Sequence, residues 1–141
     1  MCVIVDNNVV GLFLGDARFA SVRERVSSGK CCCYFGGTTQ LAEYPEQFTD
    51  ILVEFDRAGK AKVCSASRVD AEEVRVRPLC VSDDPHVIAL ARVSGARLLC
   101  TDDVGLMTDF KDKKLIDKPR GSVYRGPSHN GLLRTHCLPC S

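Results

Sequence analysis

The sequence predicts an α/β fold of three layers, α/β/α, in which helices cover both faces of a central, mostly parallel, twisted sheet. Short apolar runs rich in Val, Ile, Leu and Cys alternate with longer stretches of helical spacing. Buried parallel strands are typically continuous apolar runs, and right-handed helical crossovers connect them. The 141 residues, 45% hydrophobic and 26% charged, fit one folded domain, since a single core commonly needs about 100 to 150 residues.

In the first half of the chain, apolar runs that stop at a polar or glycine residue predict three strands, at residues 2–5, 31–35 and 61–64. The stretches between them have helical spacing and predict helices over residues 7–14, 17–26 and 38–58. Thr38 or Thr39 can cap the last of these helices, and Gly59 ends it. Pro45 is expected to kink that helix or to divide it in two.

The second half predicts two helices and two strands. The helices open at Ser or Asp residues and stop before Pro or Gly, over residues 67–76 and 84–94. The strands are expected at residues 97–100 and, at the edge of the sheet, 123–124. Residues 1–125 are therefore expected to form the domain, and residues 126–141 a loosely ordered C-terminal tail that is flexible or binds a metal.

The net charge of +1 is unevenly distributed. Residues 111–141 carry seven Lys or Arg and two Asp, a net charge of +5, so residues 1–110 carry −4. An acidic body with a basic end is compatible with a metal site beside a polyanionic ligand. It is equally compatible with simple solvation of an exposed C-terminus.

The start of the chain has no basic residue before its first apolar run, which polar residues 6–8 interrupt. Neither a signal peptide nor a membrane-spanning helix is expected. Nine cysteines would suggest a disulfide framework, but the number is odd, and Cys2, Cys64 and Cys100 lie in apolar runs. Reduced, mostly buried thiols and a cytoplasmic location are therefore expected.

Four acids are predicted to meet at the carboxyl edge of the sheet, where ligands of parallel sheets bind. Asp6 ends the first strand, Asp103 follows the strand at residues 97–100, Asp84 opens the helix before that strand, and Glu43 lies close to a turn at the same edge. Four converging carboxylates repel one another, and a divalent cation removes that repulsion. Mg²⁺ and Mn²⁺ prefer oxygen ligands and keep coordinated waters.

Each acid also has an ordinary structural interpretation. Asp84 precedes Pro85 and suits a helix N-cap, and Asp6 can cap the helix after it. Asp103 fits a turn, and Glu43 fits a solvated helix face. Independent caps have no need to share one edge, so the shared edge favours a joint site.

The segments VIVDNNVV, LAEY, SDDPHVIALARVSGARLLCTDD and MTDF together resemble the PIN-domain fold, many of whose small members are VapC-like toxin ribonucleases. The resemblance covers residues 1–110, and residues 82–103 are its most specific part. It implies that one or two Mg²⁺ or Mn²⁺ ions are bound by four acids, Asp6, Glu43, Asp84 and Asp103. The supporting residues are expected to be Asn8, Thr101 and Asp102.

This resemblance implies an endoribonuclease that directs metal-activated water at phosphorus. An antitoxin protein and a homodimer are left open as partners, and the residues do not distinguish RNA from DNA. The basic segment after Phe110 is predicted to contact the nucleic-acid backbone through Lys111, Lys113, Lys114 and Arg120. His86 is expected to be a surface residue at the start of a helix.

The segment HCLPC near the C-terminus offers part of a Zn²⁺ site, namely His136, Cys137 and Cys140. Four ligands would require one more residue, with candidates Cys31, Cys32, Cys33 and His129. Because alternate residues of a strand point to opposite faces, only Cys31 and Cys33 would share a face. A flexible or disulfide-prone tail is the alternative.

Two other classes of function stay open. One is a PIN-like module that binds nucleic acid or a protein without turnover, which Pro45 favours because it follows Glu43 by only two residues. The other is a phosphoacceptor receiver domain, which also gathers acids at strand ends. That class needs paired acids after the first strand, whereas Asn7 and Asn8 follow Asp6 here.

Overall fold

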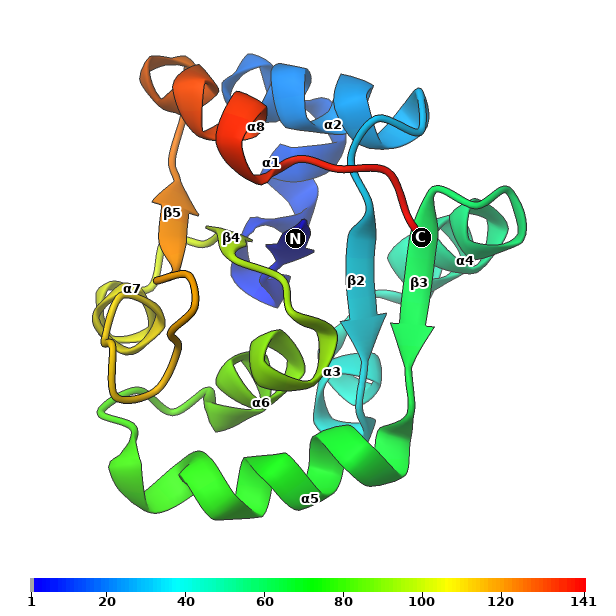
Figure 1. Ribbon diagram of the computed structural model, residues 1–141. Coiled ribbons are helices and arrows are strands. Elements are labelled where there is room, and N and C mark those ends of the chain that lie inside the picture. Colours follow the sequence, from blue (N-terminus) through cyan, green and yellow to red (C-terminus); the bar gives the residue numbers. More distant parts are fainter. Residues whose placement is uncertain (1) are drawn as a thin grey trace.

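The computed structural model describes residues 2–141, which form a five-stranded parallel sheet flanked by helices (Figure 1). The strands are β1 (Val3–Val5), β2 (Cys33–Gly36), β3 (Ala61–Cys64), β4 (Leu98–Cys100) and β5 (Ser122–Tyr124). Their order in the sheet is β3-β2-β1-β4-β5, and every neighbouring pair is parallel. The predicted α/β class and parallel sheet are confirmed.

The α-helices are α1 (Val10–Gly15), α2 (Ala20–Ser27), α3 (Thr38–Glu43), α4 (Glu46–Arg57), α5 (Ala66–Val76), α6 (Pro85–Ser94), α7 (Val104–Phe110) and α8 (Asn130–His136). Four short 3₁₀ helices join them: η1 (Asn7–Val9), η2 (Ala17–Phe19), η3 (Arg77–Leu79) and η4 (Pro127–His129). Pro45 divides the helix expected over residues 38–58 into α3 and α4, because proline cannot supply the backbone N–H that a continuous helix needs. The edge strand predicted near residue 123 is confirmed as β5.

Alternate residues of the strands supply two separate cores. Val3 and Val5 face one side of the sheet and Ile4 faces the other. The first side is covered by apolar residues of α1, α2, α4 and α8, among them Phe13, Val22, Phe48 and Leu133. The second is covered by α5, α6 and α7, with Val69, Ile88 and Leu106 among the buried side chains. Figure 1 shows α1, α2 and α8 on the opposite side from α5, α6 and α7, which makes the three layers visible.

The strand order determines where on the sheet a ligand site is expected. The chain builds outward from β1 through β2 to β3, then returns to the other side of β1 with β4 and β5. The direction of building therefore reverses between β1 and β4. In open parallel sheets, ligands bind beyond the carboxyl ends of the strands at such a reversal. The residues that follow β1 and β4 are Asp6 and the segment 101–103.

The C-terminal segment differs from expectation. A loosely ordered tail was expected over residues 126–141, but Asn130–His136 form α8, whose Leu133 is buried in the first core. Cys140 forms a disulfide with Cys32, so the expectation of reduced thiols was wrong for this pair. The Cys32 N–H also donates a 2.9 Å hydrogen bond to the Leu138 carbonyl. The tail is thus tied to the segment that leads into β2.

Across residues 2–141, the helices are too short or too polar to cross a lipid bilayer.

Candidate metal centre

Asp6 and Thr101 lie at the reversal point and are joined directly. The Asp6 backbone N–H donates to the Cys100 carbonyl at 2.9 Å, which continues the pairing of β1 with β4. The Thr101 hydroxyl donates a 2.7 Å hydrogen bond to Oδ2 of Asp6 and accepts one from the Asp103 N–H at 3.1 Å. Asp6 is only 4% exposed. Burial raises its pKa, and the hydrogen bond from Thr101 opposes that rise.

Asp84 occupies the N-cap position of α6, but its carboxylate makes no capping hydrogen bond. Burial raises the pKa of Asp84 to about 6, with further contributions from the charges of Asp6, Asp103 and Glu43. Asp84 therefore lies near the three other acids, and we call this group of four side chains the acidic pocket. A cap alone would leave the Asp84 side chain bonded to its own helix, so the ordinary structural interpretation does not explain its orientation.

Asp103 combines two roles. Its carboxylate accepts a 3.0 Å hydrogen bond from the Leu106 N–H and so caps α7, a helix that the sequence interpretation did not include. The same side chain also contacts Asp84. The cap holds Asp103 in place at the edge of the pocket, because its carboxylate is anchored to the first turn of α7.

Glu43 is the last residue of α3, and its carboxylate faces His86. Oε2 of Glu43 lies 3.4 Å from Nε2 of His86, while the imidazole is only 3% exposed. One ligand atom from each of Glu43, Asp84 and His86 lies within 4.8 Å of the others. The expectation that His86 is a surface residue was wrong.

A signal for His86 was present in the sequence. His86 follows the N-cap Asp84 by two positions, and side chains of a helix lean toward its N-terminus. An imidazole at this position therefore points back toward the same edge as the capping acid. Its burial, however, depends on α3 packing against α6, which the local sequence does not reveal.

Basic side chains do not neutralise the pocket. Among residues 2–141, no Lys or Arg forms a salt bridge with Asp6, Glu43, Asp84 or Asp103. The imidazole of His86 lies beside them: its Nε2 is close to the Glu43 carboxylate, and its charge acts on Asp6. The arrangement can hold a cation, because carboxylate oxygens and an imidazole nitrogen are typical ligands of divalent metals.

Asp102 turns away from this cluster. Its carboxylate is bound by both terminal nitrogens of the Arg18 guanidinium, one of them at 3.0 Å from Oδ2, and this pairing lowers the pKa of Asp102. Its backbone N–H lies 3.5 Å from the side-chain oxygen of Asn8, which is also 3.5 Å from the Thr101 hydroxyl. Asn8 and Asp102 therefore border the pocket. Arg18 was not expected at this edge, since nothing near it in the sequence marks it.

Asp109 holds the backbone segment that leads into the acidic pocket. This buried acid accepts hydrogen bonds of 3.0 Å from the N–H groups of Val81 and Ser82. Those two residues lead directly into Asp84, and the Ser82 hydroxyl accepts the Asp84 N–H at 3.3 Å. Asp109 thus anchors the segment that positions Asp84, without being part of the cluster itself.

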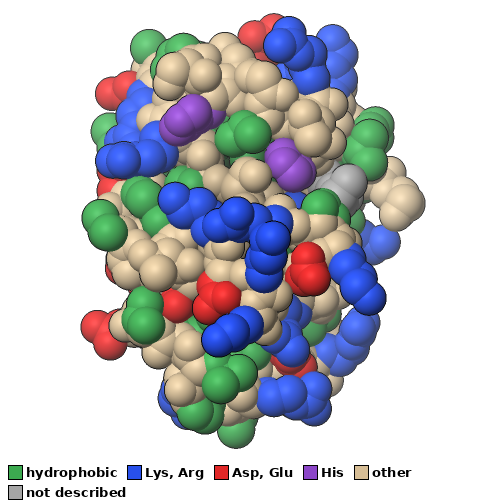
Figure 2. Space-filling view, turned by 60° about the vertical axis from the view of Figure 1, so that its left-hand side comes forward, with side chains coloured by type: hydrophobic (Ala, Val, Ile, Leu, Met, Phe, Trp, Pro, Cys, Tyr) green, Lys and Arg blue, Asp and Glu red, His purple; other side chains and the backbone are tan. Residues whose placement is uncertain are grey.

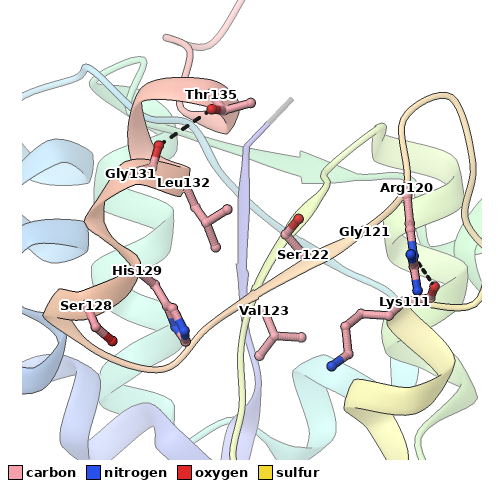
Figure 3. A pocket seen from close by; sticks show the side chains of 10 residues that line it. All are labelled: Lys111, Arg120, Gly121, Ser122, Val123, Ser128, His129, Gly131, Leu132 and Thr135. Carbon is pink, nitrogen blue, oxygen red and sulfur yellow. Dashed lines mark hydrogen bonds between the residues drawn. The ribbon is translucent and has the colours of Figure 1, made fainter.

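The basic segment surrounds a hollow beside β5. A depression of about 620 Å³ is lined by Lys111, Arg120, Ser122, His129 and neighbouring residues. In Figure 3 the Lys111 and Arg120 side chains lie on one side of β5, and His129 and Ser128 on the other. Arg120 is held by a 2.7 Å hydrogen bond from its Nε to the Lys111 carbonyl. Figure 2 shows Lys and Arg side chains gathered across this face of the molecule.

This hollow lies one strand away from the acids. β5 is paired with β4, whose end carries Thr101 and Asp103. Lys113 and Lys114 are exposed in the same loop as Lys111. The hollow lies at the start of β5, whereas the acids follow the carboxyl end of β4, so the two sites of opposite charge lie toward different ends of this pair of strands.

The zinc ligands expected in the tail are not assembled as a set. The sulfur of Cys140 is bonded to Cys32, and His129 instead accepts the Arg125 N–H through Nδ1 at 3.0 Å. His136 and Cys137 are both buried.

Comparisons of the chain with protein-family models, with curated proteins and with solved structures found no match.

Proposed function

We propose that this protein is a Mg²⁺- or Mn²⁺-dependent endonuclease that hydrolyses phosphodiester bonds of RNA. One observation supports it above all: ligand atoms of Glu43, Asp84 and His86 lie within 4.8 Å of one another, and the charges of Asp6 and Asp103 act on the same Asp84 carboxylate. Such a cluster without basic neighbours disfavours its own ionisation, and a bound divalent cation reverses that effect.

The donor set fits a divalent cation. The Asp84 carboxylate makes no cap, and its ligand atom lies within 4.8 Å of those of Glu43 and His86. Asp6 and Asp103 add carboxylate oxygens from the ends of two neighbouring strands. Carboxylates suit Mg²⁺ and Mn²⁺, and the imidazole of His86 favours Mn²⁺ of the two.

The chain's own residues orient this set. Thr101 holds Asp6 through its hydroxyl, and the cap of α7 holds Asp103. Lys111 and Arg120 offer positive charge for the phosphates of a strand that passes the pocket, which adds affinity without reading sequence. When bound, a divalent cation polarises phosphoryl oxygens and makes water nucleophilic near neutral pH.

The finer assignment depends on the resemblance to PIN domains. That resemblance supports RNA as the substrate and a toxin of a toxin-antitoxin pair as the biological role, with a small antitoxin protein as partner. A homodimer belongs to the same expectation. Mixed RNA and DNA substrates in one assay separate the choice of nucleic acid from the proposal of nuclease activity.

The test is cleavage of mixed RNA and DNA by the purified chain, with Mn²⁺, with Mg²⁺ and with a chelator. The variant Asp103→Asn keeps a side-chain oxygen for the cap of α7 but removes the charge, so the fold should persist while cleavage falls by at least about 100-fold. Asp6→Asn should show the same loss of cleavage as Asp103→Asn. Asp112→Asn is the matched control, because Asp112 accepts a backbone N–H in a turn outside the pocket. Full activity of both pocket variants would refute the proposal.

A second candidate is a module that holds nucleic acid without cleaving it. The contact between Glu43 and His86 favours it, since a protonated imidazole offsets part of the acidic charge without any metal. Heating the protein with and without Mn²⁺ separates the two, because a ligand of the native state raises the apparent stability. A chain that binds RNA, ignores Mn²⁺ and cleaves nothing would establish the second candidate.

A further inference from the structure

A second hollow, of about 410 Å³, lies where α3, α5 and α6 contact one another (Figure 1). The polar residues that line it come from these helices and from the segment that joins α5 to α6: Thr39, Glu73, Arg77, Ser82, Asp83 and His86. We call it the polar hollow. Sites for small organic groups usually have volumes of about 300 to 1,000 Å³, so this hollow is large enough to hold one. The proposed hydrolysis gives it no role.

The polar hollow and the acidic pocket are neighbours. His86 lines the hollow, and its Nε2 lies 3.4 Å from Oε2 of Glu43 in the acidic pocket. Ser82 is close to Asp103, since a Cβ placed on Gly105 would lie 3.5 Å from Ser82 and 3.3 Å from Oδ1 of Asp103. Only a sugar separates the base of a nucleotide from its phosphate. A strand with a phosphate at the acids can therefore place a base in the hollow.

Bonds within the protein hold the lining of the polar hollow in place. Glu73 is only 9% exposed, and its two carboxylate oxygens accept the Thr39 hydroxyl at 3.0 Å and the Arg77 guanidinium at 2.8 Å. Another part of the lining is anchored by Asp109, which accepts the backbone N–H groups of residues 81 and 82. The hollow is therefore formed before a ligand arrives, and a ligand loses little affinity to the ordering of side chains.

The charges of the lining determine which kind of ligand fits. Glu73 and Arg77 pair with each other, which leaves Asp83 as the charged group that is free to bind a ligand. Asp83 is exposed, and among residues 2–141 it has no salt-bridge partner. Its negative charge, close to the acidic pocket, disfavours a phosphate group in the hollow. A carboxylate instead accepts hydrogen bonds from N–H donors.

Guanine has the arrangement of donors that a free carboxylate binds best. Its Watson–Crick edge presents two adjacent N–H donors, at N1 and at the N2 amino group, and two parallel donors match the two oxygens of one carboxylate. Adenine and cytosine place an acceptor nitrogen beside their amino group, and uracil places its one N–H between two carbonyl oxygens. Each of these bases would turn a lone pair toward the carboxylate. Proteins commonly read unpaired RNA bases through this edge.

We propose that the polar hollow binds one unpaired guanine base of the RNA strand, and that Asp83 accepts the hydrogen bonds of its N1 and N2 groups. Arg77 is held by Glu73 while its side chain stays 59% exposed, so its planar guanidinium is available to stack on the base. Cleavage should then fall beside guanine. The inference rests on the proposed function in that a strand must cross the acidic pocket, but the preference for guanine needs no metal.

The test measures binding of the full chain to fluorescent RNA hexamers in the presence of a chelator, which prevents cleavage. The hexamers are UUGUUU and its three relatives with adenine, cytosine or uracil in place of guanine. The guanine hexamer should bind at least about tenfold more tightly than the others, as is typical of one bidentate contact to a base. Inosine in place of guanine keeps the N1 donor but lacks the amino group, so most of the preference should be lost.

Variants of exposed residues assign the preference to the hollow. Asp83→Asn exchanges one acceptor oxygen for a donor, so it should bind all four hexamers within about twofold of one another. Asp56→Asn is the matched control, because it removes the same charge from α4, on the other face of the sheet. Arg77→Ala should weaken binding of the guanine hexamer by about two- to fivefold. Arg75→Ala should not, since Arg75 lies outside the hollow and pairs with Glu72.

The outcomes for the hollow and for the nuclease are distinguishable. Equal binding of all four hexamers by the wild type would overturn the inference, and so would a preference for guanine that Asp83→Asn retains. Cleavage sites are then mapped on RNA of mixed sequence with Mn²⁺. A preference for guanine without any cleavage would support the hollow and refute the nuclease, whereas cleavage with equal binding of all hexamers would do the opposite.

Discussion

The Thr101 hydroxyl donates a 2.7 Å hydrogen bond to the carboxylate of Asp6, which lies 95 positions earlier in the chain. The bond joins the ends of β1 and β4 at the point where the strand order reverses. It is also the one side-chain hydrogen bond that counteracts the effect of burial on Asp6. Thr101 is therefore a positioning residue. Replacing it with valine removes the hydroxyl at nearly constant side-chain size, so the substitution should change the pKa of Asp6 without disturbing the packing.

Thr101→Val should raise the pKa of Asp6 further above its ordinary value, because the largest contribution that opposes burial is then lost. Mn²⁺ competes with the proton, so its affinity should fall about tenfold near pH 6 and less near pH 8. Calorimetric titration of Mn²⁺ at several pH values measures this. Thr108→Val is the control, since the Thr108 hydroxyl is exposed and bonds only to its own helix. Equal losses at all pH values would contradict the assigned role.

The raised pKa of Asp84 predicts how the metal-free protein responds to pH. Its folded pKa of about 6 lies above the ordinary aspartate value of 3.8, so folding favours the protonated acid. The stabilising contribution is complete below the ordinary value and is lost as the pH rises through about 6. Metal-free wild type should therefore lose stability relative to Asp84→Asn between about pH 4 and pH 6.

Thermal midpoints of metal-free wild type and Asp84→Asn across this range measure the effect, with the exposed Asp50→Asn as control. Above about pH 7, saturating Mn²⁺ should raise the midpoint of the wild type and leave Asp84→Asn nearly unchanged. A difference between the two proteins that grows as the pH falls would contradict the predicted sign.

His86→Gln should change metal preference. An imidazole favours Mn²⁺ over Mg²⁺, so its loss should weaken Mn²⁺ binding by about tenfold and Mg²⁺ binding less. The ratio of cleavage rates in the two metals is the measurement. His129→Gln is the control, because His129 bonds to a backbone N–H beside the basic hollow. An unchanged ratio would mean that His86 only pairs with Glu43.

Reduction of the disulfide should destabilise the fold. Cys32 and Cys140 are 108 positions apart, and cross-linking a loop of about 100 residues stabilises by up to about 4.7 kcal/mol through the unfolded chain. Cys140→Ser should therefore unfold at lower urea concentration, and a reductant should have no further effect on it. Cys80→Ser, which alters a free thiol, should keep its sensitivity to reductant. A wild type that is indifferent to reductant would contradict this.

The strands were predictable from the sequence because their apolar runs match the burial that the folded sheet gives them. The runs before Asp6 and at residues 98–100 are apolar on both faces, as is typical of strands in a covered parallel sheet. Pro45 marks a helix boundary through its own chemistry. The short helices α7 and α8 were missed because their apolar residues, such as Leu106 and Leu133, form a recognisable face only against the sheet.

The edge shared by the acids follows from topology, since the ends of parallel strands meet. The orientation of each side chain does not follow. Asp102 and Asp103 are adjacent in sequence, yet one pairs with Arg18 and the other contacts Asp84. His86 and the disulfide partner of Cys140 were not predictable for the same reason, because both depend on contacts between segments far apart in the chain.

The basic hollow should contribute affinity for RNA rather than catalysis. Lys111→Ala and Arg120→Ala each remove one positive charge, so each should reduce the slope of log affinity against log salt by about one and weaken binding to all sequences alike. Binding is measured between about 50 and 200 mM salt in an Asp103→Asn background, which prevents cleavage. Arg57→Ala is the control, because Arg57 is exposed on α4 and pairs with Glu54. Cleavage at saturating RNA should stay within about twofold in the otherwise wild-type chain, since phosphate contacts position the strand without touching the reacting group. If both variants keep the wild-type salt dependence, the RNA backbone passes over another part of the surface.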